Sequence, residues 1–241
     1  MRQDGIARAA AAAPRRRGSR RAAWALAGFV LLGAVAAGAG LWSLWSRWPA
    51  TPAVAAPDAP HVPIVVAGET FTVAPGAIRQ AVQRRPGPQE RVDAVYAWPE
   101  LVPPRQPEPG ASAPPPGDRV YVTIAPAAGA LEPAERLRVI WLRYARETLS
   151  PSPAGLALVE FRDGTPYQGE DLAWEENAPE KFLARCERPA PTRPPATCLS
   201  EKIVGGAVVT MRFPRDWLSD WRAVAAGFDR LLAMVRPPKA G

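Results

Sequence analysis

The sequence has almost none of the residues on which most catalytic and metal sites depend. Of its 241 residues, one is histidine and two are cysteine. The histidine, His61, lies in a proline- and alanine-rich stretch, whereas a Ser-His-Asp or Cys-His system needs histidine inside a folded pocket. The cysteines have no partners at a zinc-binding spacing, and no glycine-rich phosphate loop is present. We therefore expect no metal site, no cofactor and no catalysis by these systems.

Positive charge is also scarce outside the N-terminus. The formal charge is +7, but seven arginines lie in residues 1–21 beside a single acidic residue, Asp4. The remaining 23 basic and 22 acidic residues almost balance. A nucleic-acid-binding domain concentrates basic residues on its own folded surface. We therefore expect no nucleic-acid partner.

An uncharged stretch of 24 residues follows this basic tail. Residues 22–45 read AAWALAGFVLLGAVAAGAGLWSLW, and about 20 apolar residues suffice to cross a bilayer core. Arginines hold their side of a membrane helix in the cytoplasm, and tryptophans settle at the interfaces. We predict a transmembrane helix over 22–45 in the lipid of a bacterial inner (plasma) membrane, with 1–21 cytoplasmic and the rest periplasmic. The residues assigned to the two interfaces are Arg15, Arg16, Arg17, Arg20, Arg21, Trp42, Trp45 and Trp48.

Other interpretations of this segment stay open. It could be a cleavable signal peptide, although its apolar core is longer than usual, or a weak twin-arginine export signal around Ser19–Trp24. Both also place residues 50–241 outside the cytoplasm. Small residues four apart, such as Ala34 and Gly38, raise the alternative of a homodimer through the helix.

Proline divides the remainder of the chain. Twelve of the 30 prolines fall in two short segments. We predict that residues 46–63 are a Pro/Ala-rich tether and that 103–118 form a Pro-rich loop. The patterning between and beyond them predicts one extracytoplasmic domain over 64–236, followed by a C-terminal tail over 237–241.

The domain is predicted to be α+β, with an antiparallel or mixed sheet packed by two or three helices. Alternating patterns predict strands over 69–73, 92–98 and 119–124. Turn residues at Asp163-Gly164 and Gly205-Gly206 predict two hairpins. Apolar residues three or four apart predict helices over 75–85, 132–147 and 214–236. We expect about six or seven strands, with the helices covering one face.

The two cysteines bracket a proline-rich segment, RCERPAPTRPPATC, at 185–198. In an oxidising compartment, two cysteines without a spare are expected to pair. We therefore predict a disulfide between Cys186 and Cys198. The alternative is a redox switch, which lacks here the C-x-x-C context that activates a thiolate.

Several charged and aromatic residues have a structural and a functional interpretation. We expect Arg79, Arg84 and Arg85 to form an ordinary solvated face, and Trp217 and Trp221 to anchor the last helix in the core. Carboxylates crowd the first predicted hairpin, where they form either a solvated edge or an acid–base pair for a glycan. These carboxylates are Asp163, Glu170, Asp171, Glu175 and Glu176.

The leading hypothesis is a non-catalytic, single-pass membrane protein whose periplasmic domain binds or scaffolds another envelope protein. It rests on the predicted membrane helix and tether and on the lack of catalytic motifs. One alternative is a periplasmic glycan hydrolase that uses the carboxylates. Another is an accessory subunit of a secretion or division complex that assembles through its membrane helix.

Overall fold

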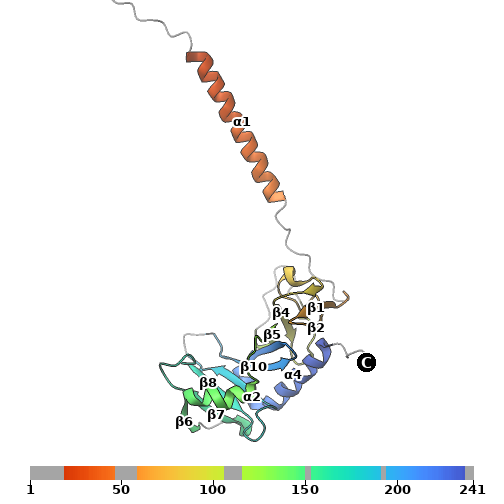
Figure 1. The fold of residues 1–241 in the computed structure, drawn as a ribbon, viewed down its shortest axis with the longest axis vertical. Helices are drawn as coiled ribbons and strands as arrows, with labels where there is room; N and C mark the ends of the chain where they lie inside the picture. The colour runs from red at the N-terminus through yellow and green to blue at the C-terminus, as the bar shows by residue number, and fades with distance from the viewer. Residues whose placement is uncertain (1–18, 47–58, 106–115, 150–152, 191–193, 237–241) are drawn as a thin grey trace, which may run out of the picture. The chain divides into compact units, whose positions relative to one another are not determined.

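The computed structural model describes residues 19–46, 59–105, 116–149, 153–190 and 194–236 (Figure 1). The chain divides into two units, Met1–Ala53 and Val54–Gly241. The described part of the first unit is one long helix, α1 (Ser19–Ser46). Within it, Trp24–Trp45 is long and apolar enough to cross a membrane. A helix of this length and composition near an N-terminus serves as a membrane anchor or as a signal sequence.

The described part of the second unit contains two sheets (Figure 1). The smaller has the order β2-β1-β3 and is mixed, because β1 pairs antiparallel with β2 and parallel with β3. Its strands are β1 (Val62–Val66), β2 (Glu69–Val73) and β3 (Gly87–Pro88). The larger is antiparallel, in the order β4-β5-β11-β10-β9-β8-β7-β6. Its strands are β4 (Val92–Ala97), β5 (Arg119–Pro126), β6 (Ala145–Leu149), β7 (Ala157–Phe161), β8 (Glu170–Trp174), β9 (Leu183–Glu187), β10 (Thr197–Val204) and β11 (Ala207–Pro214).

The larger sheet has two halves whose faces are covered differently. In the first half (β4, β5, β11 and β10), buried and partly exposed residues alternate along β5 and β11. This alternation is typical of a sheet with one packed and one solvated face. In the second half (β9, β8, β7 and β6), almost every residue of β7 and β8 is buried. The first half therefore has an open face, whereas β7 and β8 are packed on both sides.

Helices pack on both faces of the larger sheet. The last helix, α4 (Trp221–Val235), buries its apolar residues in one cluster with the inner face of the first half. The turns α2 (Pro133–Arg136), η3 (Leu137–Trp141) and α3 (Leu142–Tyr144) run consecutively, and η3 packs in a second cluster against the second half. Successive residues of a strand point to opposite faces, and in β8 Leu172 belongs to the second cluster whereas Ala173 belongs to the first.

The structure confirms the α+β class and differs from the prediction in several elements. The described residues form eleven strands rather than six or seven, because short strands such as β3 and β9 show no alternation. The helices lie on both faces rather than one. The hairpin at Gly205-Gly206 is present, with Val204 opposite Ala207. The strands around Asp163-Gly164 pair as expected, but an eight-residue connection joins β7 to β8.

Two predicted helices are shorter than expected. The helix predicted over 132–147 ends at Tyr144, and the chain continues as β6, the outermost strand of the second half. The last α-helix begins at Trp221 rather than 214, after the 3-10 turns of η5 (Arg215–Asp220). Trp221 is 5 % exposed, and Trp217 packs against the core at its edge. Both tryptophans therefore anchor the start of the last helix, as predicted.

The predicted helix over 75–85 is wrong. Only η1 (Ala81–Gln83) is helical, and it is a single 3-10 turn. Ile78 instead forms a bridge with Ala94 of β4, and the Val95 amide donates to the Ala77 carbonyl at 2.9 Å. Burial of Ile78 beside a strand edge outweighs the weak helical preference of the segment.

A close approach of two elements explains a glycine inside α4. Glycine costs about 1 kcal/mol relative to alanine in a helix interior. A Cβ at Gly227 would overlap the ring of Trp98. The Trp98 ring also lies against Trp217, with centroids 5.0 Å apart. Gly227 therefore allows the chain after β4 to pack directly on α4.

We expect the substitution Gly227→Ala to lower the free energy of unfolding by about 2 kcal/mol, since overpacking outweighs the gain in helix propensity. Urea denaturation of the purified protein measures the change. The control is the same substitution in a Trp98→Leu background, where the loss should largely disappear. An equal loss in both backgrounds would contradict a clash with Trp98.

Candidate functional site

The two halves of the larger sheet meet along a short ladder between β9 and β10. Only three residue pairs join these strands, against eight between β10 and β11. Cys186 and Cys198 are directly opposite each other in this ladder, and both are fully buried. Their sulfur atoms lie at bonding distance, 1.98 Å. The disulfide thus links the two halves at a short ladder in the middle of the sheet.

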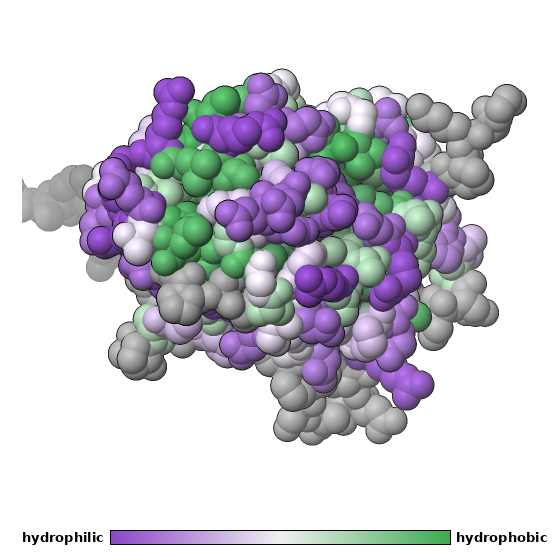
Figure 2. Space-filling view, turned by 90° about the horizontal axis from the view of Figure 1, so that it is seen from below, coloured by the Kyte–Doolittle hydropathy of each residue, from purple (hydrophilic) through white to green (hydrophobic). Residues whose placement is uncertain are grey.

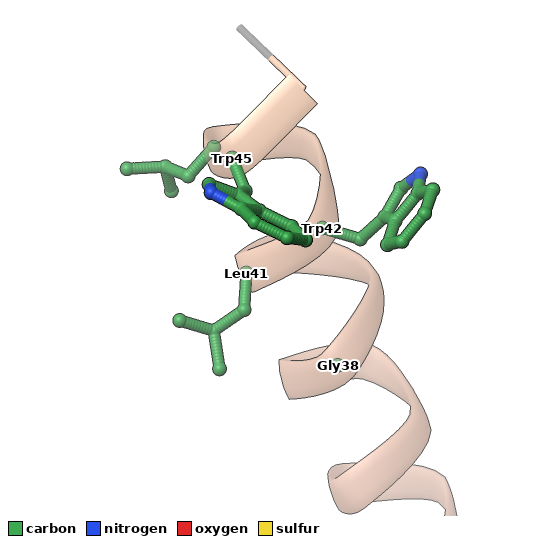
Figure 3. Close-up of a pocket in the computed structure, with 5 residues that line it drawn as sticks. Gly38, Leu41, Trp42 and Trp45 are labelled. Carbon is green, nitrogen blue, oxygen red and sulfur yellow. The ribbon is translucent and has the colours of Figure 1, made fainter. Parts of the chain in front are cut away.

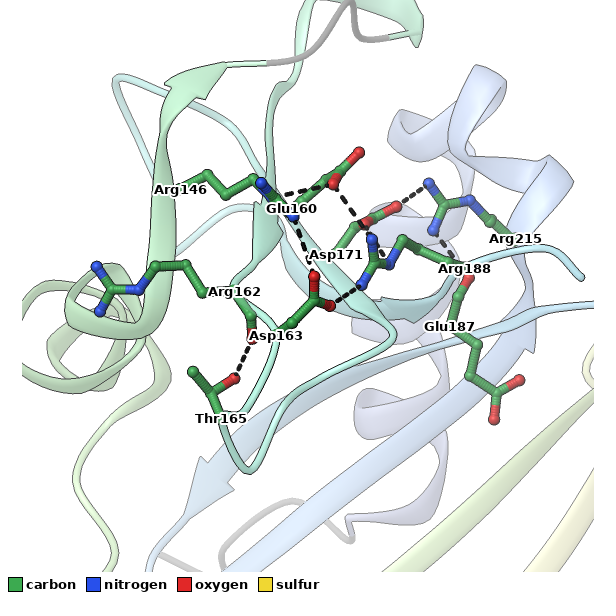
Figure 4. A network of polar contacts seen from close by, with 9 residues as sticks. All are labelled: Arg146, Glu160, Arg162, Asp163, Thr165, Asp171, Glu187, Arg188 and Arg215. Carbon is green, nitrogen blue, oxygen red and sulfur yellow. Dashed lines mark hydrogen bonds and ion pairs between the residues drawn. The ribbon is translucent and has the colours of Figure 1, made fainter.

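A buried ion pair lies beside the disulfide. Asp171 is opposite Cys186 in the β8–β9 ladder and is 4 % exposed. Arg215, at the start of η5, donates to the Asp171 carboxylate and, at 2.9 Å, to the carbonyl of Glu187 (Figure 4). Burial raises the pKa of the Asp171 carboxyl, although Arg215 and Arg188 act to lower it. Arg215 therefore connects the end of β11 to the second half of the sheet.

Further charged side chains surround Asp171 on the surface (Figure 4). Arg188 lies 3.8 Å from Asp171, 3.2 Å from Glu160 and 3.7 Å from Asp163. Arg146 of β6 lies 3.3 Å from Glu160 and 3.4 Å from Asp163. These contacts form a network in which arginines separate the carboxylates.

The structure brings together some of the carboxylates that the sequence singled out. Asp163 and Asp171 share the network around Arg188, and Glu170 pairs with Arg185 at 3.0 Å. Glu175 and Glu176 follow β8, and neither forms an ion pair within the described residues. Acid–base catalysis on a glycan needs two carboxyl groups that face a shared substrate space. Here the arginines occupy the space between them, and the arrangement is one of structural ion pairs.

The residues assigned to the membrane interfaces lie in α1 or next to it in the sequence. Arg15, Arg16, Arg17 and Trp48 fall outside the described residues, and Arg20 and Arg21 belong to the first turns of α1. Trp42 and Trp45 stand one turn apart near the other end, with ring centroids 6.3 Å apart (Figure 3). Both side chains are exposed.

A polar groove crosses the open face of the first half. It has a volume of about 380 Å³ and touches all four strands of that half or the residues next to them. We call it the arginine groove. Its residues are Arg79, Arg91, Asp93, Tyr121, Thr123, Leu199, Thr210 and Arg212.

The floor of the arginine groove follows from strand register. Asp93 pairs with Thr123, and Thr123 pairs with Thr210, so these three side chains form a row across β4, β5 and β11. Tyr121 pairs with Arg212 in the adjacent row on the same face. The packed face carries the intervening residues, such as Val122 and Met211, which are buried.

Asp93 is the acidic centre of the groove, and its carboxylate is fully engaged. Arg91 donates to its Oδ1 at 2.7 Å, Thr123 donates to Oδ1 at 2.9 Å, and Gln83 donates to Oδ2 at 3.3 Å. Burial alone would raise the pKa of the Asp93 carboxyl, but these hydrogen bonds hold it below its ordinary value. Asp93 therefore stays ionised at neutral pH and holds the Arg91 head in place.

The sequence did not reveal this groove. Tyr121 and Thr123 alternate outward in a strand that the sequence predicted, and so do Thr210 and Arg212. However, β5 and β11 are about 80 residues apart, and nothing in either strand shows that they are neighbours. Arg79 was expected on a solvated face; it is exposed, but it stands over the ring of Tyr121 at 5.2 Å.

Other surfaces of the domain are less organised. The face shown in Figure 2 is a mosaic of small hydrophobic patches between hydrophilic side chains. Exposed apolar residues such as Val139, Leu142 and Leu149 contribute surface of this kind. Among the described residues, no group of three or more His, Cys, Asp or Glu side chains could hold a metal ion.

No protein-family model matches the chain, and no curated protein matches its sequence. Among solved structures, the chain is similar to an immunity protein of the Stenotrophomonas maltophilia type IV secretion system. The TM-score is 0.50 at 14% identity, over 74% of this chain and 94% of the other. It is also similar to the iron-regulated outer membrane lipoprotein FrpD of Neisseria meningitidis, with a TM-score of 0.40 and 10% identity over 75% and 96% of the two chains. At such identities the likeness concerns the fold.

We expect replacement of both cysteines by alanine to lower the free energy of unfolding by about 3 kcal/mol, since the bond closes a short loop. Chemical denaturation without reductant measures this change. Wild-type protein treated with dithiothreitol should lose the same stability. Free thiols in protein taken from the native envelope would contradict the disulfide.

We expect the substitution Arg215→Gln to cost about 3 kcal/mol at neutral pH, because it leaves Asp171 buried without its main partner. A raised pKa means that protonation of Asp171 favours the folded state, so the cost should shrink as the pH falls toward about 4. Denaturation across this pH range measures both effects. The control is Arg188→Gln. Arg188 lies 3.8 Å from Asp171, farther than Arg215 does, so its loss should lower the free energy of unfolding by less than about 1 kcal/mol. A cost that does not change with pH would contradict the assignment to Asp171.

Proposed function

We propose that this protein is a single-pass, membrane-anchored binding protein of the bacterial envelope, whose domain holds another envelope protein. The observation that carries the proposal is the open face of the first half of the sheet. That face displays a polar groove on a rigid floor, because the opposite face of the same strands is packed against α4. Rigid strands with outward side chains supply a surface whose geometry is set before a partner arrives.

The first unit of the chain supports the anchoring part of the proposal. The apolar span Trp24–Trp45 suits a membrane helix, and the arginines before it predict that the N-terminus stays in the cytoplasm. We place Arg15, Arg16, Arg17, Arg20 and Arg21 at the cytoplasmic interface. Trp42, Trp45 and Trp48 take the opposite interface. The domain then lies on the periplasmic side of the inner membrane, joined to the helix by the tether over 46–63.

The arrangement of carboxylates favours binding over glycan hydrolysis. Asp163, Glu170 and Asp171 each lie within ion-pairing distance of an arginine. A general acid needs a carboxyl group that can exchange a proton with substrate, and these groups face guanidinium instead. The similarity in fold to an immunity protein of a secretion system is in keeping with a binding role.

Site-specific photo-crosslinking in intact cells tests the proposal. A photoreactive amino acid at Thr210, in the arginine groove, should yield a discrete adduct with one envelope protein. The same residue at Ala226, on the exposed side of α4, is the control and should not yield that adduct. Mass spectrometry of the purified adduct identifies the partner.

Two outcomes would contradict the proposal. One is the same set of adducts from both positions, which would indicate random collision. The other is turnover of envelope glycan by the purified protein that is lost on Asp171→Asn but kept on Thr210→Ala. That result would instead support the hydrolase hypothesis.

A further inference from the structure

We propose that the arginine groove binds a short acidic segment of the partner, a run of aspartate or glutamate side chains on an extended peptide. This inference rests on the proposed function and adds the chemistry of the partner. It follows from the charge of the groove, from how its arginines are held and from its dimensions.

The groove is unbalanced in charge. Three arginines line it, and its one carboxylate, Asp93, is already saturated by donors from Arg91, Thr123 and Gln83. Elsewhere in the second unit, arginines such as Arg188 and Arg215 face carboxylates of the same chain. The groove therefore has cationic groups whose charge the described residues do not neutralise.

Arg79 and Arg212 are the groups that a ligand would meet first. Within the described residues, Arg79 has no carboxylate in ion-pairing distance, and its guanidinium lies over the Tyr121 ring. Arg212 lies 3.9 Å from Glu187 with both side chains about half exposed. Such an exposed pair contributes little and is readily exchanged for a better-placed carboxylate. The Tyr121 ring restricts the Arg79 guanidinium, which lowers the entropy cost of binding.

The spacing of the arginines favours a chain of charges over one compact anion. Arg91 directly precedes β4 and Arg212 lies on β11, with β5 between these strands. Asp93, which holds the Arg91 head, is level with Thr123, whereas Arg212 is level with Tyr121, two residues away on β5. Neighbouring strands are about 4.8 Å apart and residues along a strand about 3.3 Å, so the two positions are separated by roughly 12 Å. A single phosphate cannot contact both guanidinium groups at that distance. Carboxylates spaced along an extended peptide, which rises about 3.3 Å per residue, can contact both.

The uncharged residues that line the groove also suit a peptide. The groove spans four strands, roughly 14 Å from β4 to β10, which corresponds to about four extended residues. Leu199 and the Tyr121 ring supply apolar contacts, and the Thr210 hydroxyl can donate to a backbone carbonyl. Arginine forks bind carboxylates in a bidentate manner. The groove therefore fits a segment of four or five residues that is rich in carboxylates.

Binding of a labelled peptide to the full-length protein in detergent micelles tests this inference. The probe is a fluorescent peptide with five consecutive glutamates flanked by serines, and the reference probe has glutamines in their place. We expect saturable binding of the glutamate peptide alone, weakened by added salt. The double variant Arg79→Gln/Arg212→Gln should weaken binding by about tenfold, the combined effect of two ion pairs.

The matched control removes the same charge elsewhere. Arg222→Gln/Arg230→Gln neutralises two exposed arginines of α4 and should leave the affinity unchanged. Arg91 is kept in all variants, because its loss would strand the buried Asp93. Thermal unfolding should coincide for the three proteins, which separates a binding effect from a folding one.

Several outcomes would overturn the inference. Equal binding of the glutamate and glutamine peptides would exclude recognition of carboxylates. Equal losses in both double variants would show a general charge effect, and displacement of the peptide by millimolar inorganic phosphate would indicate a phosphate site instead. The double variant Arg79→Gln/Arg212→Gln can also be tested in the crosslinking experiment. If crosslinking at Thr210 captures a partner equally well in the wild type and in this variant, the binding role is supported and recognition of an acidic segment is excluded. If crosslinking at Thr210 fails while the peptide binds, the proposed function fails alone.

Discussion

The second unit depends on the connection between β9 and β10. Two hydrophobic clusters lie against different parts of the larger sheet, and only three residue pairs continue the hydrogen-bonded ladder between its halves. The Cys186–Cys198 bond and the Asp171–Arg215 pair reinforce this junction. The disulfide closes a short loop between consecutive strands, with a sequence separation of 12, whereas the ion pair joins residues 44 apart in the sequence. The first cluster also crosses the junction, through residues of the second half such as Ala173 and Ala184, so these two interactions add to packing that the halves share.

The junction also relates the core to the open face. Residues of β10 and β11 contribute both to the packed cluster, through Cys198 and Met211, and to the groove, through Leu199 and Arg212. Leu199 is the groove residue that belongs to the junction ladder, where it is opposite Arg185 of β9. Order at the junction therefore helps to fix one end of the groove as well as the core.

The sequence predicted those parts of the fold that depend on local pattern. The apolar residues of α4 recur every three or four positions, and Trp221, Val224 and Phe228 are buried as that spacing indicates. The Gly205-Gly206 turn carries its own signal because a tight hairpin favours a positive φ, which Gly205 adopts at 58°. The segment over 75–85 has a helical pattern but forms a bridge to β4, since the position of β4 decides its structure. The arginine groove was not predictable for the same reason: its residues come together only through the order of distant strands.

The bridge at Ile78 has a consequence for encounters between copies of the protein. β4 is an outer strand of the larger sheet, and residues 77–79 occupy part of its free edge. At the other border, β6 carries exposed charges, with Arg146 paired to Glu160. Bare strand edges would let the sheets of two copies join when they meet. Residues 77–79 at one border and charges at the other disfavour such pairing.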